Sequence, residues 1–433
     1  MKILIVSSYF GPETSVGVLR VNAFANHWSR MGHEVHVLTM PYSGILPEGL
    51  RDNPLVKVHQ VAPWFIRGGQ AGGVQGYSKG VTGGRKALLS FQYWLKRKLL
   101  SNYLDPRLLW WPRASLLGRK LLNTESFDLL YSTVPSYTAH SAAALIKRSN
   151  RKLFWVADYR DLWSGNPIFP GCAPVRVFER WHERKVLASA DLICSINQPL
   201  VDELCEVHGE REFLVLPNGF EDREVEVFRD AGWQPLPARV NIVYAGSILP
   251  GLQNPTPLLL AIRDLAVSGA IRTGDLCVSF YGDYAALDDF PVARDPLVTP
   301  FINLCGKVSR QEILAVQKSA QFLLFLGSQP VSRGVGSTTG VVSGKIFEYL
   351  ISGTEILAVG VTDEMLVAEM ISQARVGTHY AADVDKIRQR LLAALNGDAV
   401  KVQPNMEYLN QFRRSVQAAF LMDQVQKHSV SYL

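Results

Sequence analysis

The sequence KILIVS at residues 2–7, followed by VGVLRVNAFANHWSRMG at 16–32 and HEVHVLT at 33–39, decides the fold. The first and third segments are short and rich in Val, Ile and Leu, which is typical of buried strands. The middle segment has apolar residues at helical spacing and ends in Gly32, a residue suited to the position just after a helix. A strand, a helix and a second strand in this order predict a parallel pair joined by a right-handed crossover.

The same alternation of short apolar runs and helical patterns continues through both halves of the chain. Further strands are predicted at FDLLYS, KLFWVAD and DLICSI (127–132, 152–158 and 191–196), and then at NIVYAGS, CVSFYGD, QFLLFLG and EILAVG (241–247, 277–283, 321–327 and 355–360). Ser309 and Glu312 have the spacing of a capping box ahead of a further helix. We therefore predict an α/β protein with two Rossmann-like, doubly wound domains that face each other across a cleft.

A change in composition marks the boundary between the two halves. Between residues 220 and 238 the chain turns from apolar to charged and proline-bearing. We predict an N-terminal domain at 1–220 that carries a basic amphipathic insertion at about 67–120. A C-terminal domain follows at 221–405, and a final helix at 406–433 is expected to pack back on the N-terminal domain.

The overall composition is that of a globular protein. Hydrophobic residues make up 47% of the 433 positions and charged residues 19%. No apolar run approaches the roughly 20 residues that a membrane-spanning helix needs, and the short apolar start predicts a first strand rather than a signal peptide. The five cysteines are scattered, without metal-ligand spacing or a disulfide framework. These features predict a cytoplasmic protein with reduced thiols.

Positive charge is concentrated in the first half. Residues 1–220 hold 26 Lys and Arg against 17 Asp and Glu, whereas the remainder has a net charge of −3. Part of this excess lies in a basic amphipathic helix predicted at 84–103. Aromatic and basic residues here suit the surface of an anionic membrane, namely Trp94, Lys96, Arg97 and Lys98, and then Trp110 and Trp111. An ordinary core helix with a solvated basic face is the open alternative, and no module that reads a nucleic-acid groove is recognisable.

The stretch SGKIFEYLISG at 343–353 points to a ligand site. Ser343 is expected to cap the start of a helix, and Gly344 allows a ligand to approach closely. Phosphate is attracted to such a start, where Lys345 adds a full positive charge. Glu348, one turn further in, is placed to accept hydrogen bonds from the vicinal hydroxyls of a ribose. Phosphate at the rim and a sugar diol below it together predict a nucleotide-sugar site.

KIFEY at 345–349 resembles the donor-binding signature of the retaining glycosyltransferases of family four, which have the GT-B fold. The resemblance extends to PNGF at 217–220 and to GKVSRQEILAVQKSAQF at 306–322. It implies an enzyme of hexosyltransferase type (EC 2.4), with the acceptor on the N-terminal domain and the nucleotide-sugar donor on the C-terminal domain. In the family, the glutamate at the position of Glu348 holds the ribose.

RDLW at 160–163 resembles the branch that acts on polyprenyl-diphosphate-linked sugars. That resemblance implies a lipid-linked saccharide as acceptor, in surface polysaccharide or glycoconjugate synthesis, and a peripheral position at the inner face of the membrane. Arg160 and Asp161 follow a strand at the sheet edge that faces the expected cleft, so we assign both to catalysis on the acceptor side.

The remaining donor contacts are expected at glycine-bearing loops. Gly17 follows the first strand and allows a sugar or diphosphate to approach the backbone. The other residues expected to contact the donor diphosphate, besides Lys345, are Gly246, Ser247, Gln253 and Arg333. No metal-ligand cluster is recognisable, so neither a metal nor a cofactor besides the nucleotide-sugar co-substrate is expected.

The chain also departs from the family pattern. Thr133 and Arg160 stand in loops where many members carry a histidine, and Gly340 stands where a second glutamate is usual. Two alternatives therefore stay open: a nucleotide-sugar epimerase of the same fold, and a non-catalytic partner subunit.

Overall fold

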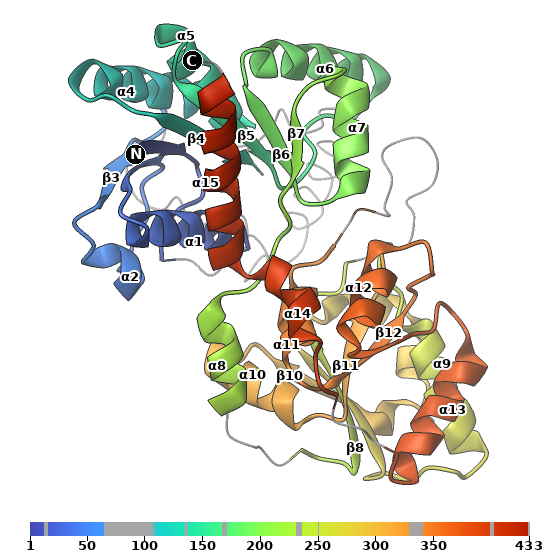
Figure 1. Cartoon of the computed structure of the whole chain (residues 1–433). Helices are drawn as coiled ribbons and strands as arrows, with labels where there is room; N and C mark the ends of the chain where they lie inside the picture. Colours follow the sequence, from blue (N-terminus) through green and yellow to red (C-terminus); the bar gives the residue numbers. More distant parts are fainter. Residues whose placement is uncertain are drawn as a thin grey trace. The chain divides into compact units, whose positions relative to one another are not determined.

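The computed structural model describes residues 1–12, 16–64, 107, 109–134, 137–166, 171–230, 236–249, 251–328, 340, 342–398 and 402–431. These residues form two compact units (Figure 1). Unit 1 contains the described residues up to Asn218 together with those from Arg414 onward, and unit 2 contains the described residues from Gly219 to Arg413.

Unit 1 is built on a sheet of seven parallel strands in the order β3-β2-β1-β4-β5-β6-β7. The strands are β1 Lys2–Val6, β2 Glu34–Thr39, β3 Val56–Gln60, β4 Leu129–Val134, β5 Phe154–Tyr159, β6 Leu192–Ser195 and β7 Phe213–Val215. The helices are α1 Val16–Arg30, α2 Glu48–Arg51, α4 Trp111–Thr124, α5 Thr138–Ser149, α6 Ala173–Leu187, α7 Gln198–His208 and α15 Arg414–Ser431. Gly32, which follows α1, has a φ of +85°, as its predicted place after the helix requires.

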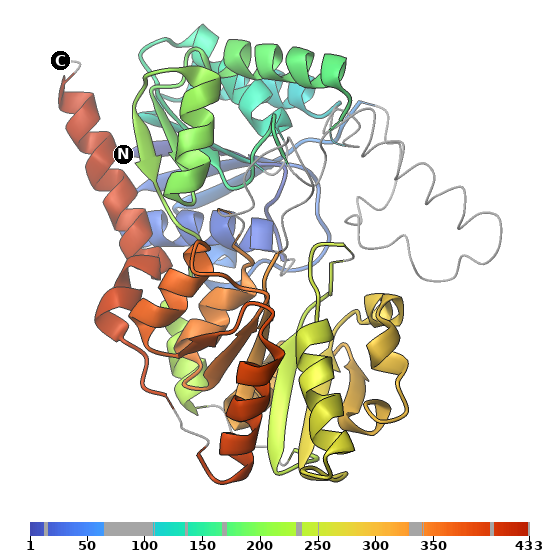
Figure 2. The same ribbon diagram turned by 90° about the vertical axis from the view of Figure 1, so that its right-hand side faces the viewer.

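Helices cover both faces of this sheet because alternate strand residues point to opposite sides. On β1, Ile3 and Ile5 pack in one cluster with residues of α1 and α15, whereas Leu4 and Val6 pack in another with residues of α4 and α5. The C-terminal helix is part of this layer: the indole N–H of Trp28 on α1 donates to the carbonyl of Ala418 at 3.1 Å. Figure 2 shows α15 in red beside the blue α1.

Unit 2 repeats the scheme with six parallel strands in the order β10-β9-β8-β11-β12-β13. The strands are β8 Val240–Ala245, β9 Leu276–Tyr281, β10 Ile302–Gly306, β11 Phe322–Leu326, β12 Glu355–Val359 and β13 Gly377–His379. The helices are α8 Asp222–Asp230, α9 Thr256–Val267, α10 Arg310–Ser319, α11 Lys345–Ile351, α12 Leu366–Ala374, α13 Val384–Leu395 and α14 Met406–Leu409, with 3₁₀ turns η4 Ala285–Asp289, η5 Pro291–Arg294, η6 Thr299–Phe301 and η7 Asn410–Phe412. Ser309 caps α10 by accepting from the N–H of Glu312 at 3.2 Å.

The prediction of two doubly wound α/β units is confirmed. In both sheets the strand order reverses next to the first strand of the unit, between β1 and β4 in unit 1 and between β8 and β11 in unit 2. Loops that leave these neighbouring strands in opposite directions open a crevice at the carboxyl ends, which is where open α/β sheets bind ligands. The topology therefore predicts one ligand-binding position in each unit, at the carboxyl ends of these strands.

The C-terminal segment differs in detail from the single helix expected at 406–433. It is broken at Arg413, whose backbone is extended, so that α14 belongs to unit 2 and only α15 belongs to unit 1. The break has a visible cause: the N–H of Phe220 donates to the carbonyl of Phe412 at 3.0 Å, and Arg413 pairs with Asp222. These contacts hold the two ends of unit 2 together.

None of the described helices is long and apolar enough to cross a membrane. The basic helix predicted at 84–103 lies outside the described residues, and so do Trp94, Lys96, Arg97 and Lys98.

Candidate functional site

The crevice of unit 2 brings together the loop after β8 and the start of α11. Gly246, directly after β8, has a φ of +123°. A methyl group added to Gly246 would lie 3.1 Å from the Nζ of Lys345, so the glycine leaves room for this ammonium group. The N–H of Ala245 donates to the hydroxyl of Tyr349 at 3.0 Å, which fixes α11 against the end of β8. Two segments a hundred residues apart thus meet at the predicted edge of the sheet.

Lys345 places a cation in this crevice, and no counter-charge from the described part of the chain is bonded to it. Its Nζ lies 3.8 Å from the centroid of the Tyr244 ring, is closed off from solvent, and has no hydrogen-bond partner among the residues that the structure describes. Burial lowers the pKa of Lys345 to about 7, although the nearby carboxylate of Glu348 acts in the opposite direction. Buried polar groups are almost always bonded in native proteins, so an unpaired ammonium here favours an anionic ligand.

Glu348 lies on the same helix and is held by an arginine that the sequence had not singled out. Arg310, at the start of α10, donates from one guanidinium nitrogen to Glu348 at 2.5 Å and from another to Glu224 at 2.5 Å. Burial opposes the charge of Arg310, but the two carboxylates hold its pKa above the usual value. Arg310 and Glu224 therefore orient the carboxylate that we expect to meet the ribose.

The start of α11 differs from the prediction in one respect. The N-cap residue is Gly344, and no side chain makes a capping hydrogen bond there. Ser343 contributes its carbonyl instead, which accepts from the N–H of Ile346 at 3.1 Å. The capping role predicted for the Ser343 hydroxyl is therefore wrong, because the turn places the serine one residue before the cap. The apolar face of α11 is buried, through Ile346, Phe347, Leu350 and Ile351.

Gln253, predicted as a diphosphate contact, supports the loop instead. It is buried, and its side-chain oxygen accepts from the N–H of Leu249 at 3.0 Å while its amide donates to the carbonyl of Leu326 at 3.2 Å. The Tyr244 hydroxyl also contacts this oxygen, at 3.2 Å. Ser247 is exposed in the loop that Gln253 holds. Arg333, the remaining predicted contact, lies outside the described residues.

In unit 1, the loop after β1 meets the loop after β5. A methyl group added to Gly17 would lie 2.9 Å from Nη1 of Arg160 and 3.3 Å from the ring of Tyr9. The space that we expected a diphosphate or sugar to use is thus filled by a guanidinium group. A second cation lies against Tyr9, since Arg107 is 4.1 Å from the centroid of the Tyr9 ring.

Arg160, directly after β5, has one guanidinium nitrogen that is not bonded to any described residue. Its Nη2 donates to Asp161 at 3.0 Å, but its Nη1 is buried and has no partner among the described residues. The carboxylate of Asp161 is about half exposed. An unpaired guanidinium nitrogen beside an exposed carboxylate suits an acceptor that carries both a phosphate and a hydroxyl.

Thr133 and its neighbours serve a buried ion pair. Thr133 and Tyr131 donate to Asp158 at 2.7 and 2.6 Å, and Arg20 of α1 binds both carboxylate oxygens of Asp158, at 2.8 and 3.0 Å. Burial alone would raise the pKa of Asp158, but the Arg20 charge and these hydrogen bonds hold it below its usual value. Arg20 also donates to the carbonyls of Leu216 and Pro217. No local pattern predicts this network, because its members are far apart along the chain.

The tryptophans at the start of α4 do not both point to a membrane. Trp110 is fully buried, and its indole N–H donates to the carbonyl of Val61 at 3.0 Å. The prediction that Trp110 lies at a membrane surface is therefore wrong: its ring fills the core between α4 and the chain after β3. Trp111 is half-buried and packs against the same core.

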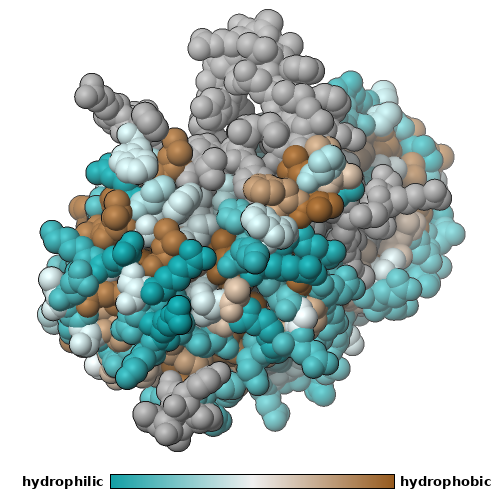
Figure 3. Space-filling view, turned by 90° about the horizontal axis from the view of Figure 1, so that it is seen from above, coloured by the Kyte–Doolittle hydropathy of each residue, from teal (hydrophilic) through white to brown (hydrophobic). Residues whose placement is uncertain are grey.

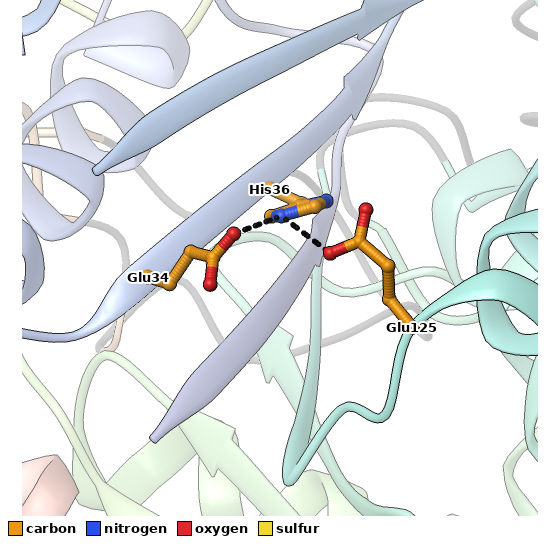
Figure 4. Close-up of side chains that lie close together, drawn as sticks. All are labelled: Glu34, His36 and Glu125. Carbon is orange, nitrogen blue, oxygen red and sulfur yellow. Dashed lines mark hydrogen bonds and ion pairs between the residues drawn. The ribbon is translucent and has the colours of Figure 1, made fainter. Parts of the chain in front are cut away.

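One group of side chains has the composition of a metal site. Glu34, His36 and Glu125 offer ligand atoms within 4.8 Å of one another (Figure 4). Both carboxylates already bind lysines, with Lys57 at 2.6 Å from Glu34 and Lys2 at 2.7 Å from Glu125. The hydrogen bonds of Glu34 with Lys57, first, and with His36 lower the pKa of Glu34 to about 2. The group lies at the amino ends of the strands, away from the ligand edge, and we interpret it as an ion-pair cluster.

Comparisons with known proteins agree with this architecture. Residues 17–219 match the family model of the glycosyl transferase 4-like domain. The chain is similar in structure to sucrose-phosphate synthase from Thermosynechococcus elongatus, with 12% identity and a TM-score of 0.59 over 100% of both chains. It is also similar to the apo form of a lipopolysaccharide outer core galactosyltransferase, with 13% identity and a TM-score of 0.55 over 100% of both chains.

A third similar structure is that of a putative UDP-N-acetylglucosamine 2-epimerase from Listeria monocytogenes. Its identity is 12% and its TM-score 0.54, over 99% of this chain and 96% of that one. No curated protein matches the sequence. At these identities the structures show the shared fold alone, and the family model covers residues 17–219. That part of the chain is therefore similar to the glycosyl transferase 4-like domain, in a chain with the GT-B fold.

Proposed function

We propose that this protein is a glycosyltransferase that moves a sugar from a nucleoside-diphosphate donor to an acceptor hydroxyl, with retention of the anomeric configuration. The observation that carries the proposal is the Lys345 ammonium, buried and unpaired among the described residues at the β8–β11 crevice of unit 2. The glycosyl transferase 4-like domain at 17–219 supports the same reaction class.

The donor is held by residues that each meet one part of it. Lys345 binds the diphosphate and stabilises the negative charge that develops on the leaving group. Gly246 and Ser247 lie in the exposed loop beside that ammonium and complete the phosphate contacts. Glu348, oriented by Arg310, accepts hydrogen bonds from the ribose hydroxyls. The charge of the leaving group is met by protein side chains, and we propose no metal requirement.

The acceptor is held by the cationic edge of unit 1. The free nitrogen of Arg160 binds a phosphate of the acceptor, and Asp161 orients the attacking hydroxyl. This arrangement suits a saccharide linked to a membrane lipid through a diphosphate. Such an acceptor requires the enzyme to work at a membrane surface, and we propose a peripheral position at the inner face of the membrane.

A melting-temperature screen of the purified protein against UDP-, GDP-, ADP- and dTDP-sugars tests the donor site. A ligand that binds only the native state raises the melting temperature once its concentration exceeds its dissociation constant. We expect a shift with one base class, and the loss of that shift in Lys345→Gln and Glu348→Gln. Lys386→Gln, on the solvent side of α13, is the matched control, because its side chain is largely exposed.

Product analysis then separates the reaction classes. A transferase releases the nucleoside diphosphate in proportion to the glycosylated acceptor. An epimerase instead converts the donor without an acceptor. This chain shares its fold with an epimerase, so the assay includes the donor alone. If well-folded protein shows no melting shift with any donor, the proposal is wrong and the non-catalytic alternative takes its place.

A further inference from the structure

Helix α6 of unit 1 has an unusual distribution of side chains between its two faces. Its outward face exposes Val177, Phe178 and Trp181, with exposed fractions of 72%, 53% and 54%. Together with the exposed Pro174 they have the spacing of one helical stripe. Leu116 on α4 and Val267 on α9 stand singly on their helices, and α15 has a shorter and less exposed pair, Val416 and Phe420. A continuous apolar stripe on a solvent-facing helix marks an interaction surface.

The charges on α6 are also sorted by face. Both of its acids are fully buried: Glu183 accepts from the Tyr159 hydroxyl at 2.7 Å and from the N–H of Ser164 at 3.0 Å, and Glu179 lies beside it on the inward side. The exposed charged residues of the helix are all basic, namely Arg180, Arg184 and Lys185. The outward face therefore combines aromatic rings and positive charge and carries no acid.

This combination matches the chemistry of an anionic bilayer. Aromatic side chains settle at the boundary between headgroups and acyl chains, while Lys and Arg attract acidic headgroups. A protein partner of mixed charge would need an excess of acids opposite this face, whereas an anionic bilayer presents negative charge over its whole surface. In Figure 3, which views the molecule from above, hydrophobic residues interrupt the hydrophilic surface on the side where α4, α5 and α6 lie in Figure 1.

The stripe is connected to the acceptor edge by a series of rings. Tyr137, just after β4, stacks on Trp163 with centroids 4.7 Å apart, and Trp163 meets His182 of α6 at 5.3 Å. The series continues from His182 to Phe178 at 6.1 Å and ends with Trp181, 5.7 Å from Phe178. Trp163 follows Asp161 by two residues and contacts α6. The helix that bears the exposed stripe therefore packs beside the residues proposed to bind the acceptor.

We propose that the outward face of α6 is a membrane-docking surface that seats unit 1 on an anionic bilayer beside its lipid-linked acceptor. Its position next to the acceptor edge rests on the proposed function, but the docking itself does not depend on catalysis. The stripe of Pro174, Val177, Phe178 and Trp181 enters the interface, and Arg180 and Lys185 bind acidic headgroups. Arg184 is held at the edge of this face by the carbonyls of Glu206 and Val207.

Flotation of the full-length protein with lipid vesicles tests the docking surface. We expect binding to vesicles of phosphatidylcholine with phosphatidylglycerol, weaker binding to phosphatidylcholine alone, and weaker binding at high salt. The double variant Phe178→Ala with Trp181→Ala is expected to lose about tenfold or more in vesicle affinity, because two large apolar side chains no longer enter the interface. Arg180→Gln with Lys185→Gln is expected to lose about fivefold per charge on anionic vesicles only.

Matched controls exclude loss of folding and general surface effects. Val267→Ala with Leu304→Ala removes two similarly exposed apolar side chains from unit 2, and we expect it to bind vesicles like the wild type. All variants are expected to keep the wild-type melting temperature, since the altered side chains are exposed. They are also expected to keep sugar transfer to a water-soluble acceptor analogue.

Several outcomes would overturn the inference. The inference is wrong if the wild type does not bind anionic vesicles, or if the α6 variants bind these vesicles with the affinity of the wild type. It is also wrong if the α6 variants lose sugar transfer to the soluble analogue. A wild-type oligomer that becomes monomeric in the Phe178 and Trp181 variant, without vesicle binding, would assign the stripe to a protein contact instead. Vesicle binding through α6 without any sugar transfer would contradict the proposed function but would still support the docking surface.

Discussion

In the proposed donor site, a single residue, Lys345, is expected to couple ligand binding to protonation. Its pKa in the free protein is about 7 because burial disfavours the charged form. A diphosphate bound beside the ammonium favours that form and raises its pKa, so binding takes up protons near neutral pH. We expect the affinity for the nucleoside diphosphate to fall as the pH rises above about 7, by up to about tenfold per pH unit.

Isothermal titration calorimetry of nucleoside-diphosphate binding between about pH 6 and pH 9 measures this dependence. In Lys345→Met the affinity is expected to be low at every pH and the slope to disappear. A wild-type affinity that does not change over this range would mean that Lys345 does not bind the phosphates.

The same residue is expected to cost the free protein stability. Because its pKa is depressed from 10.5 to about 7, the unfolded state binds more protons than the native state between these values. The free energy of unfolding therefore rises with pH in that window, and the destabilisation is complete below about pH 7. We expect Lys345→Met to melt at a higher temperature than the wild type at pH 6 and to lack the rise in stability above pH 7.

Thermal unfolding followed by circular dichroism, without ligand, gives this comparison. Lys386→Met serves as control, since the Lys386 side chain is largely exposed. A Lys345→Met protein that is less stable than the wild type would show that the ammonium is bonded in the free protein, and the donor-site assignment would lose its main support.

At the scale of elements, the buried pair of Arg20 and Asp158 joins α1 to β5. The Arg20 side chain also reaches the carbonyls of Leu216 and Pro217 after β7, so one guanidinium bonds three parts of unit 1. Both side chains are almost completely buried. We expect Arg20→Met to cost about 3–5 kcal/mol, because it leaves the Asp158 carboxylate buried without its counter-charge.

Urea unfolding of the single variants and of Arg20→Met with Asp158→Asn tests this pair. The double variant is expected to lose less than the sum of the two single losses, since no unpaired charge remains. Because the pKa of Asp158 is held below its ordinary 3.8, the stabilisation is present above that pH and is lost as the pH falls through the lower folded value. Additive losses would show that the two side chains do not interact.

The strands and most helices could be predicted because their signal is local. Buried parallel strands are continuous apolar runs, and the alternation of Ile3 and Ile5 with Leu4 and Val6 fills both faces of one sheet. The errors concern contacts that local patterns do not contain. Trp110 belongs to a sequence that suits a membrane interface and a core equally well, and only its contact with Val61 decides between them.

The residues of the candidate site also fall into those with a local signal and those brought together only by packing. Lys345 and Glu348 are neighbours on one helix, so their spacing was readable in the sequence. Arg310 is 38 residues away from Glu348 and meets it only through the packing of α10 in unit 2. Gln253 was expected to bind phosphate because it is a polar residue near the end of a strand, but its amide is bonded to the backbone.

At the scale of the whole chain, the division into two units predicts how fragments fold. Unit 2 has its own core on both faces of its sheet, and the contact between Phe220 and Phe412 closes its two ends. We expect a fragment of residues 219–413 to unfold cooperatively and to keep binding the nucleoside diphosphate, because Lys345, Glu348 and Arg310 all belong to it.

Unit 1 is expected to behave differently, because its last helix comes from the far end of the chain. Leu421, Met422 and Val425 of α15 are buried in the cluster that contains Trp28 of α1. A fragment of residues 1–218 therefore exposes that apolar surface, and we expect it to bind a hydrophobic dye and to melt at a lower temperature than the same fragment joined to 414–433 by a flexible Gly/Ser linker. Leu421→Asp in the linked fragment is expected to abolish the gain. Equal melting temperatures with and without 414–433 would show that α15 contributes no stability to unit 1.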